Sequence, residues 1–329
     1  MRISNGGYIM GRKQIIKENK VSEIYNFKLG GYNQKVLIEG KFKDLPIVIT
    51  FHGGPGSPIP LSVGARGMLP EFTDKFIMVY WDQLGCGINN YPLDDTFTVD
   101  KLVTMAVDLI NNIKSLFPNN KIYVFAVSWG SVLIVKVLER CPNIVDGAVV
   151  SGQIIKDIFL NDEVINSLSQ TKLSKKKIDV IRKMDADNFT SKDLKMISIS
   201  LGKYTDAYTN KKGKPISIVK FILGLMMSPD YKFKDFKAVI KNGYANNTSI
   251  WREILKIDLS KILKEVEVPY IILQGDTDIV TPTSWVKELV DNSHNPNLKC
   301  YIVENTGHMP GEELVDGIIK ELSNLVYAK

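Results

Sequence analysis

One serine in the sequence stands between a buried apolar run and a helical pattern. Residues 124–132 read V-F-A-V-S-W-G-S-V, so Ser128 follows K-I-Y-V-F-A-V and precedes W-G-S-V-L-I-V-K-V-L-E-R. A strand–turn–helix junction is the context in which a serine is exposed as a nucleophile, usually within G-x-S-x-G. Ala126 replaces the first glycine, but it is still small enough for a sharp turn, and Gly130 keeps the second. We therefore predict that Ser128 is a nucleophile.

A serine hydroxyl is a weak nucleophile until a neighbouring base takes its proton. The chain offers only His52, His294 and His308. His308 lies in N-T-G-H-M-P, just after the apolar run 299–304, and we predict that it is the base and later protonates the leaving group. His52 opens a turn and is predicted to be structural, whereas His294, in N-S-H-N-P, is predicted to be solvated.

An acid that fixes the histidine tautomer would complete such a site. The segment G-D-T-D-I-V-T-P, after the run 269–274, supplies Asp276 and Asp278. The G-x-x-D spacing from Gly275 and the downstream Pro282 place Asp278 at the loop tip, so we predict Asp278 as the partner of the base. Asp276 is predicted to stabilise the loop. The chain order serine, aspartate, histidine is that of α/β-hydrolases and not of chymotrypsin or subtilisin.

Residues 52–56 read H-G-G-P-G and follow the apolar run 46–51. Three glycines and a proline make a rigid turn whose bare backbone N–H groups can point at a ligand. Acyl transfer needs such donors for its oxyanion. We assign one donor to the backbone N–H of Gly54 and the other to that of Trp129, the residue after the serine.

These residues need a scaffold that brings distant segments together. Short apolar runs that are typical of buried strands alternate with helical patterns at 99–117, 129–140, 283–293 and 311–327. The runs are 35–40, 46–51, 76–81, 121–127, 147–151, 269–274 and 299–304. The pattern predicts the α/β class, with a mostly parallel central sheet flanked by helices. The alternation stops between 153 and 259, so we expect a core of 1–152 and 260–329 and an inserted all-helical cap of 153–259.

The composition is that of an ordinary globular protein, with 329 residues and a net charge of +6. Residues 151–260 hold 20 Lys and Arg against 12 Asp and Glu, but these lysines lack the aromatic interleaving of a nucleic-acid face. No apolar run is long enough to span a membrane, so we expect neither a nucleic acid nor a membrane as partner. Three scattered cysteines and a start without an apolar leader predict a cytoplasmic protein. No metal or cofactor motif is present, and none is expected.

Four motifs together resemble the proline iminopeptidase (prolyl aminopeptidase) branch of the α/β-hydrolase fold. They are H-G-G-P-G at 52–56, W-D-Q-L-G-C-G at 81–87, S-W-G-S at 128–131 and S-G-Q at 151–153. The resemblance covers about 30–152 and 260–328. It implies a serine hydrolase that releases an N-terminal residue, preferably proline, from small peptides through an acyl-enzyme. The triad that it implies is Ser128, Asp278 and His308, the same residues chosen above from their positions.

The sequence departs from this family at three places that matter. Ala126-Val127 replaces the glycine pair usual before the serine. Leu84 replaces the arginine usual after the D-Q pair, and the cap has only Glu163 and Glu253 to hold a substrate amino group as the family's cap glutamates do. Glu253 is our candidate for substrate binding, with a surface ion pair to Arg252 or Lys256 as the alternative. Two other functions therefore stay open: a carboxylesterase or amidase for a small acyl substrate, and a non-catalytic hydrolase-like binding protein.

Overall fold

The computed structural model describes residues 8–327 except 215, 245 and 310. Its centre is one eight-stranded sheet in the order β1-β2-β4-β3-β5-β6-β7-β8. The strands are β1 (Val21–Leu29), β2 (Tyr32–Gly40), β3 (Ile47–Phe51), β4 (Ile77–Tyr80), β5 (Ile122–Val127), β6 (Gly147–Ser151), β7 (Tyr270–Gly275) and β8 (Leu298–Val303). β1 pairs antiparallel with β2, β2 pairs antiparallel with β4, and the other pairs are parallel. The predicted α/β class with a mostly parallel sheet is confirmed.

Helices flank the sheet and follow most of its strands. They are α1 (Tyr8–Glu18), α2 (Pro70–Thr73), α3 (Val99–Leu116), α4 (Trp129–Arg140), α5 (Asp162–Ser169), α6 (Lys175–Arg182), α7 (Ser191–Tyr204), α8 (Ile218–Met226), α9 (Phe233–Ile240), α10 (Thr248–Leu255), α11 (Ser260–Lys264), α12 (Thr283–Asp291) and α13 (Glu312–Tyr327), with 3-10 turns η1 (Val63–Ala65) and η2 (Gly87–Asn89). None of the helices among the described residues has the length and apolar character needed to span a bilayer.

Strands β3 to β7 bury both of their faces, which explains why they are continuous apolar runs in the sequence. Alternate residues along one strand belong to different cores: Ile47 and Ile49 pack with α3 and α4, whereas Val48 packs with α2 and α13. β1 was not predicted, because V-S-E-I-Y-N-F-K-L is a half-exposed edge strand with polar residues between its apolar ones. β2 begins at Tyr32, three residues before the predicted run.

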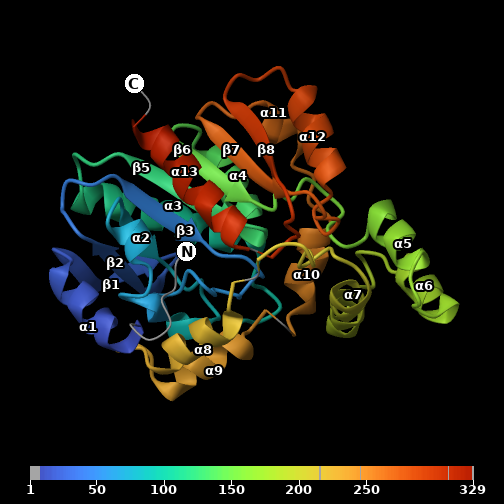
Figure 1. The fold of residues 1–329 in the computed structure, drawn as a ribbon, viewed down its shortest axis with the longest axis horizontal. Helices are drawn as coiled ribbons and strands as arrows, with labels where there is room; N and C mark the ends of the chain where they lie inside the picture. Colours follow the sequence, from blue (N-terminus) through green and yellow to red (C-terminus); the bar gives the residue numbers. More distant parts are fainter. Residues whose placement is uncertain (1–7, 215, 245, 310, 328–329) are drawn as a thin grey trace.

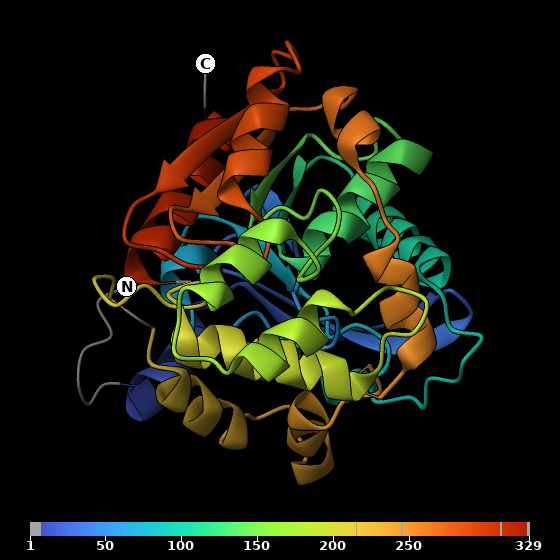
Figure 2. The ribbon, with the colours of Figure 1, turned by 90° about the vertical axis from the view of Figure 1, so that its right-hand side faces the viewer.

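Between β6 and β7, the described residues hold seven helices, α5 to α11, and no strand. In Figure 1, α5 and α6 project beside the sheet, whereas α8 and α9 lie along the lower edge of the molecule. Figure 2 shows α5 to α7, in green and yellow, in front of the core. The division into a core of 1–152 and 260–329 and a cap of 153–259 stays a prediction, and residues 1–7 and 328–329 of that core lie outside the described residues.

Candidate active site

Ser128 sits in a sharp turn between β5 and α4. Its backbone has φ 51° and ψ −114°, a conformation that non-glycine residues rarely adopt and that costs about 1–3 kcal/mol. Its N–H donates to the Ser151 carbonyl at 2.8 Å, and its own carbonyl accepts from the Ser131 N–H at 2.7 Å. These bonds hold the strained turn, and the turn presents the hydroxyl at the start of α4.

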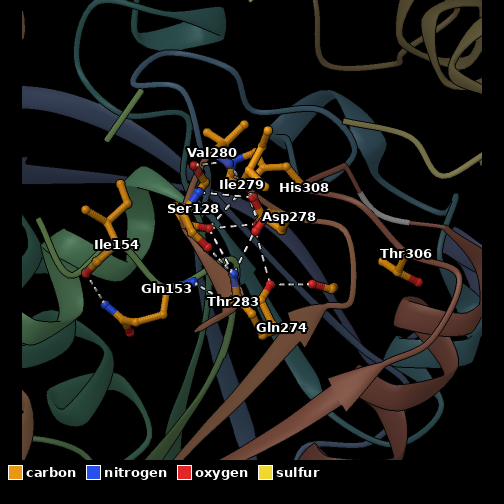
Figure 3. Close-up of polar contacts among 12 residues, drawn as sticks. Ser128, Gln153, Ile154, Gln274, Asp278, Ile279, Val280, Thr283, Thr306 and His308 are labelled. Carbon is orange, nitrogen blue, oxygen red and sulfur yellow. Dashed lines mark hydrogen bonds and ion pairs between the residues drawn. The ribbon is translucent and has the colours of Figure 1, made fainter. Parts of the chain in front are cut away.

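Three side chains that are distant in sequence meet at this turn (Figure 3). The Nε2 atom of His308 lies 2.8 Å from the Ser128 hydroxyl oxygen, and its Nδ1 atom lies 2.7 Å from Oδ2 of Asp278. All three side chains are buried, and the ring of Tyr208 contacts the imidazole edge-on, with 6.1 Å between centroids. An imidazole that donates through Nδ1 to a carboxylate has a lone pair on Nε2, so it can accept the serine proton.

The carboxylate of Asp278 accepts four hydrogen bonds besides that of the histidine. Oδ1 accepts from the backbone N–H groups of Val280 at 2.9 Å and Thr281 at 3.0 Å. Oδ2 accepts from the Thr281 hydroxyl at 2.7 Å and from the side-chain amide of Gln274 at 3.2 Å. Every one of these groups is a donor, and together they fix the orientation of a side chain that is only 1% exposed.

The other candidate aspartate lies elsewhere in the same loop region. Asp276 accepts from the backbone N–H groups of Asn305 and Thr306, both at 2.9 Å, and so ties the loop after β7 to the loop after β8. His294 is exposed in a turn after α12. Neither residue is among those that line the cavity at Ser128.

Comparison with known proteins identifies the family of this chain. The family model described as "alpha/beta hydrolase fold" matches residues 46–313, which is most of the chain. The chain belongs to the α/β-hydrolase fold family. Hydrolase activity follows from the family at that general level.

The relatives of this α/β-hydrolase include proteins named as peptidases. The probable aminopeptidase YbaC of Bacillus subtilis is 19% identical over 306 residues, which cover 90% of this chain and 93% of that protein. A proline iminopeptidase of Heyndrickxia coagulans is 22% identical over 266 residues, covering 80% and 84%. The solved structure of a proline iminopeptidase-related protein of Thermus thermophilus has a TM-score of 0.61 at 19% identity, covering 94% of this chain and 99% of that one. The predicted likeness to the proline iminopeptidase branch is thereby confirmed.

The H-G-G-P-G loop and the start of α4 are joined by one buried amide. The side chain of Gln83 donates to the His52 carbonyl at 3.2 Å and accepts from the Trp129 indole N–H at 3.0 Å. Its backbone N–H also donates to Nε2 of His52 at 3.0 Å, while Nδ1 of His52 lies 2.9 Å from the Gly53 carbonyl. Burial lowers the pKa of His52 to about 4, so this ring is neutral and fixes the loop that carries Gly54.

A cavity of about 320 Å³ opens at the hydroxyl of Ser128 and reaches beneath the cap. No Asp, Glu, Lys or Arg is among its described lining residues. Its polar lining residues are His52, Ser57, Ser128, Ser151, Ser198, Tyr208, Asn242 and His308. The others are apolar or glycine and include Ile59, Leu61, Leu69, Phe72, Phe125, Val127, Phe159, Leu194, Ile216, Phe221, Trp251, Met309, Val315 and Ile318. The cavity is therefore suited to a neutral, apolar group.

The structure does not bring Glu253 to this cavity. Its carboxylate accepts from the backbone N–H of Val99 at 3.0 Å and so satisfies a free donor at the start of α3. The cavity lining does not include it, and Lys256 forms its ion pair with Asp187 instead. Both roles considered for Glu253, the amine anchor and the surface ion pair, give way to a helix cap, because its helix turns this side chain toward the core.

Two glutamines position the site. The sequence analysis missed Gln274 and named Gln83 only as part of a motif that carries the family resemblance. Gln274 is the last residue but one of β7 and holds Asp278, and its oxygen accepts from the Gln153 N–H at 3.0 Å. Gln83 links both loops that carry the assigned oxyanion donors. The only signal in the sequence was a polar amide at the end of an apolar run. Among the residues that the structure describes, no three or more His, Cys, Asp or Glu side chains gather to hold a metal ion.

Proposed function

We propose that this α/β-hydrolase is a serine hydrolase that cleaves neutral esters or amides with a small apolar acyl group. One observation carries the choice of substrate: the lining of the cavity at Ser128 is apolar and, among the described residues, without a charged side chain. A cavity of about 320 Å³ lies at the lower end of the range for small-molecule sites. The acyl group is therefore small.

The proposed reaction runs through an acyl-enzyme. His308 takes the proton of Ser128 while the serine oxygen attacks the acyl carbonyl, and Asp278 holds the imidazole in the tautomer that leaves Nε2 free. The backbone N–H groups of Gly54 and Trp129 are assigned to the oxyanion. The imidazolium then protonates the leaving alcohol or amine, and water, activated by the same histidine, releases the acid.

An N-terminal peptide residue would bring a positive charge into the same cavity. Burying an ammonium group without a carboxylate partner is costly, because desolvation is not offset by an ion pair. Asp278 already accepts five hydrogen bonds, and Glu253 caps α3. The geometry therefore favours a neutral acyl group over a free amino acid residue.

Release of N-terminal proline is the second candidate, and the names of the relatives support it. The relative from Heyndrickxia coagulans is named a proline iminopeptidase, and the Bacillus subtilis protein is named a probable aminopeptidase. A substrate amine in this chain would need hydrogen bonds from neutral groups in the cavity, such as Asn242 or Tyr208.

Two substrates that differ only in the amine separate these candidates. The p-nitroanilide of proline and that of cyclopentanecarboxylic acid share a ring size and a leaving group, but only the first carries an ammonium group. We expect the neutral compound to have a kcat/KM about 100-fold higher, which corresponds to about 2.7 kcal/mol of unpaired charge burial. The p-nitrophenyl ester of the same acid provides a more reactive neutral substrate.

Ser128→Ala is the control for the mechanism. Its turnover of every substrate should fall by at least about 10³-fold. Faster cleavage of the prolyl compound would refute the neutral-acyl assignment and favour the aminopeptidase. Turnover by Ser128→Ala close to that of the wild type would refute the acyl-enzyme itself.

A further inference from the structure

Helix α8 is apolar on both of its sides, although only one side faces the protein. It reads I-V-K-F-I-L-G-L-M. Phe221 and Leu225 point inward and are 2% and 1% exposed, and Phe221 lines the cavity at the candidate active site. Val219, Leu223 and Met226, spaced four and three residues apart, form an outward stripe with exposures of 66%, 50% and 57%. A surface helix of an ordinary globular protein is polar on that side.

The neighbouring helix α9 also carries exposed apolar side chains. Phe233 is 77% exposed and Ile240 is 60% exposed. Among the described residues, 17 large apolar side chains are exposed, and seven of them fall within 218–240. These seven are Ile218, Val219, Leu223, Met226, Met227, Phe233 and Ile240. Single exposed apolar residues need no explanation, but a cluster of this kind marks a surface that binds something.

Basic residues flank the apolar cluster. Four exposed lysines lie on α9 or at its two ends: Lys232, Lys234, Lys237 and Lys241. The only acidic residues within 216–241 are Asp230 and Asp235. Asp230 forms an ion pair with Arg66 at 2.8 Å, and Asp235 is 5% exposed and accepts from the backbone N–H of Lys232. The outer surface of this segment is therefore positive as well as apolar.

The inner side of α8 is fixed to the core, so its outer side cannot simply turn inward. The buried guanidinium of Arg12 donates to the carbonyls of Gly224 on α8 and Gly64 in η1, both at 2.8 Å. A side chain at Gly224 would meet Met68 at 2.3 Å, which shows how closely the helix approaches the core. Figures 1 and 2 both place α8 and α9 at the lower edge of the molecule.

We propose that the α8–α9 face, meaning the seven exposed apolar residues and the four lysines, docks on an anionic lipid surface. Val219, Leu223, Met226 and Phe233 would enter the boundary between headgroups and acyl chains, and the lysines would contact the anionic headgroups. A second copy of the chain fits less well, because a symmetric pair of these faces would bring like charges together. The sequence pattern predicted no membrane partner, and this proposal departs from that prediction.

The same face adjoins a second cavity whose lining overlaps that of the candidate active site. This second cavity, of about 170 Å³, is lined by the exposed Ile218 and shares Ile216, Phe221 and Met309 with the cavity at Ser128. A docked protein could thus receive an apolar acyl substrate from the lipid layer. This delivery route rests on the proposed function, whereas the docking itself does not.

Vesicle co-sedimentation tests the docking without any activity measurement. The full chain is mixed with vesicles of phosphatidylglycerol and phosphatidylcholine, or of phosphatidylcholine alone, at low and high salt. We expect binding that requires phosphatidylglycerol and weakens with salt. The double variant Lys234→Gln/Lys237→Gln should bind about 30-fold more weakly, at about 1 kcal/mol per lysine. The double variant Leu223→Ser/Phe233→Ser should lose at least about tenfold.

Matched control variants lie on other surfaces. Ile199→Ser/Phe42→Ser removes an exposed aliphatic and an exposed aromatic residue, and Lys175→Gln/Lys176→Gln removes two lysines of α6. Both controls should bind as the wild type does, and thermal unfolding should show that all four variants are folded.

Three outcomes would overturn the docking proposal. The first is absence of binding to anionic vesicles at low salt, and the second is an equal loss in the control variants. The third is a dimer, seen by light scattering, that Leu223→Ser/Phe233→Ser dissociates, because a second copy would then cover the face. The proposed function has its own readout in the anilide assay, so either proposal can fail without the other.

Discussion

Replacing Asp278 by asparagine tests the hydrogen bonding of the candidate triad, because the substitution changes one atom and almost no volume. An asparagine oxygen in the Oδ1 position would keep the hydrogen bonds from the N–H groups of Val280 and Thr281. The opposite orientation would point an amide NH₂ at these two donors, and each unmet bond would cost about 1–3 kcal/mol. The donors at Oδ1 are backbone N–H groups that cannot turn away, whereas at Oδ2 the Thr281 hydroxyl can rotate to accept and His308 can change tautomer, which leaves only the Gln274 amide opposed. We therefore expect the oxygen at Oδ1 and the NH₂ group facing Nδ1 of His308, which now lies 2.7 Å from Oδ2.

That orientation forces the histidine into the wrong tautomer. With a donor opposite, Nδ1 must accept, so the ring proton moves to Nε2, which then has no lone pair for the Ser128 proton. The carboxylate that stabilises the imidazolium is also gone. The corresponding change in serine proteases lowers kcat by about 10⁴-fold, and we expect a loss of this order, equivalent to about 5.4 kcal/mol of barrier.

The assay compares kcat and KM of Asp278→Asn with those of Asp276→Asn on the p-nitrophenyl ester. Asp276 holds the N–H groups of Asn305 and Thr306, so its variant should lose some stability and less than about tenfold in kcat. Thermal unfolding of both variants separates misfolding from a catalytic defect. The reasoning fails if Asp278→Asn keeps kcat within tenfold of the wild type, or if Asp276→Asn loses as much as Asp278→Asn.

Three further changes test the surroundings of the site. Gln83→Leu leaves the indole N–H of Trp129 and the carbonyl of His52 unpaired. Urea unfolding should therefore show a free energy of unfolding lower by about 2–5 kcal/mol, together with a lower kcat. Unchanged values would contradict the linking role of Gln83. Glu253→Gln should lower stability by about 1 kcal/mol through the cap at Val99 and leave KM within about twofold, whereas a large KM increase for an amine substrate would restore the anchor. Burial raises the pKa of Asp82 to about 6. The wild type's free energy of unfolding should therefore fall by up to about 3 kcal/mol through this group as pH rises from about 4 through about 6. In urea titrations, Asp82→Asn should abolish that part of the decline.

The sign of the Asp82 effect follows from which state binds more protons. Its carboxyl group is ionised above pH 3.8 or so when unfolded but stays protonated up to about pH 6 when folded. The folded state therefore binds more protons between these values, and stability falls as pH rises. If Asp82→Asn and the wild type show the same pH dependence, then the buried carboxyl does not titrate as this environment requires.

The residues that meet in the site were predictable where a reactive side chain directly follows a predicted strand. Ser128, Asp278 and His308 each follow an apolar run, and the carboxyl ends of parallel strands meet at one edge of the sheet. Long-range neighbours without such a rule were not predictable. Gln83 and Trp129 are joined only because the loop after β4 passes over the start of α4, a contact that no local pattern encodes.

Helix patterns carried less information than strand patterns about which side faces the protein. Glu253 lies on an amphipathic helix, α10, and the sequence alone did not show that its carboxylate reaches the start of α3. In α8 the only charged residue is Lys220, so the sequence pattern does not mark which side faces the solvent. The structure shows a helix buried on one side and exposed on the other, which is the observation behind the docking proposal.

The space on the two sides of the Ser128 turn is unequal, which explains why G-x-S-x-G can lose its first glycine to Ala126 but keeps Gly130. A Cβ atom at Gly130 would lie 2.0 Å from the carbonyl oxygen of Phe51, which belongs to the buried strand β3 and cannot move aside. Ala126 already carries a Cβ in β5, where it pairs with Phe51 in an ordinary parallel ladder. The second glycine of the motif is therefore required by backbone contact, whereas the first needs only a small residue. A sequence search that requires both glycines of G-x-S-x-G would therefore miss this chain, because it would reject the Ala126 methyl group that the fold accommodates.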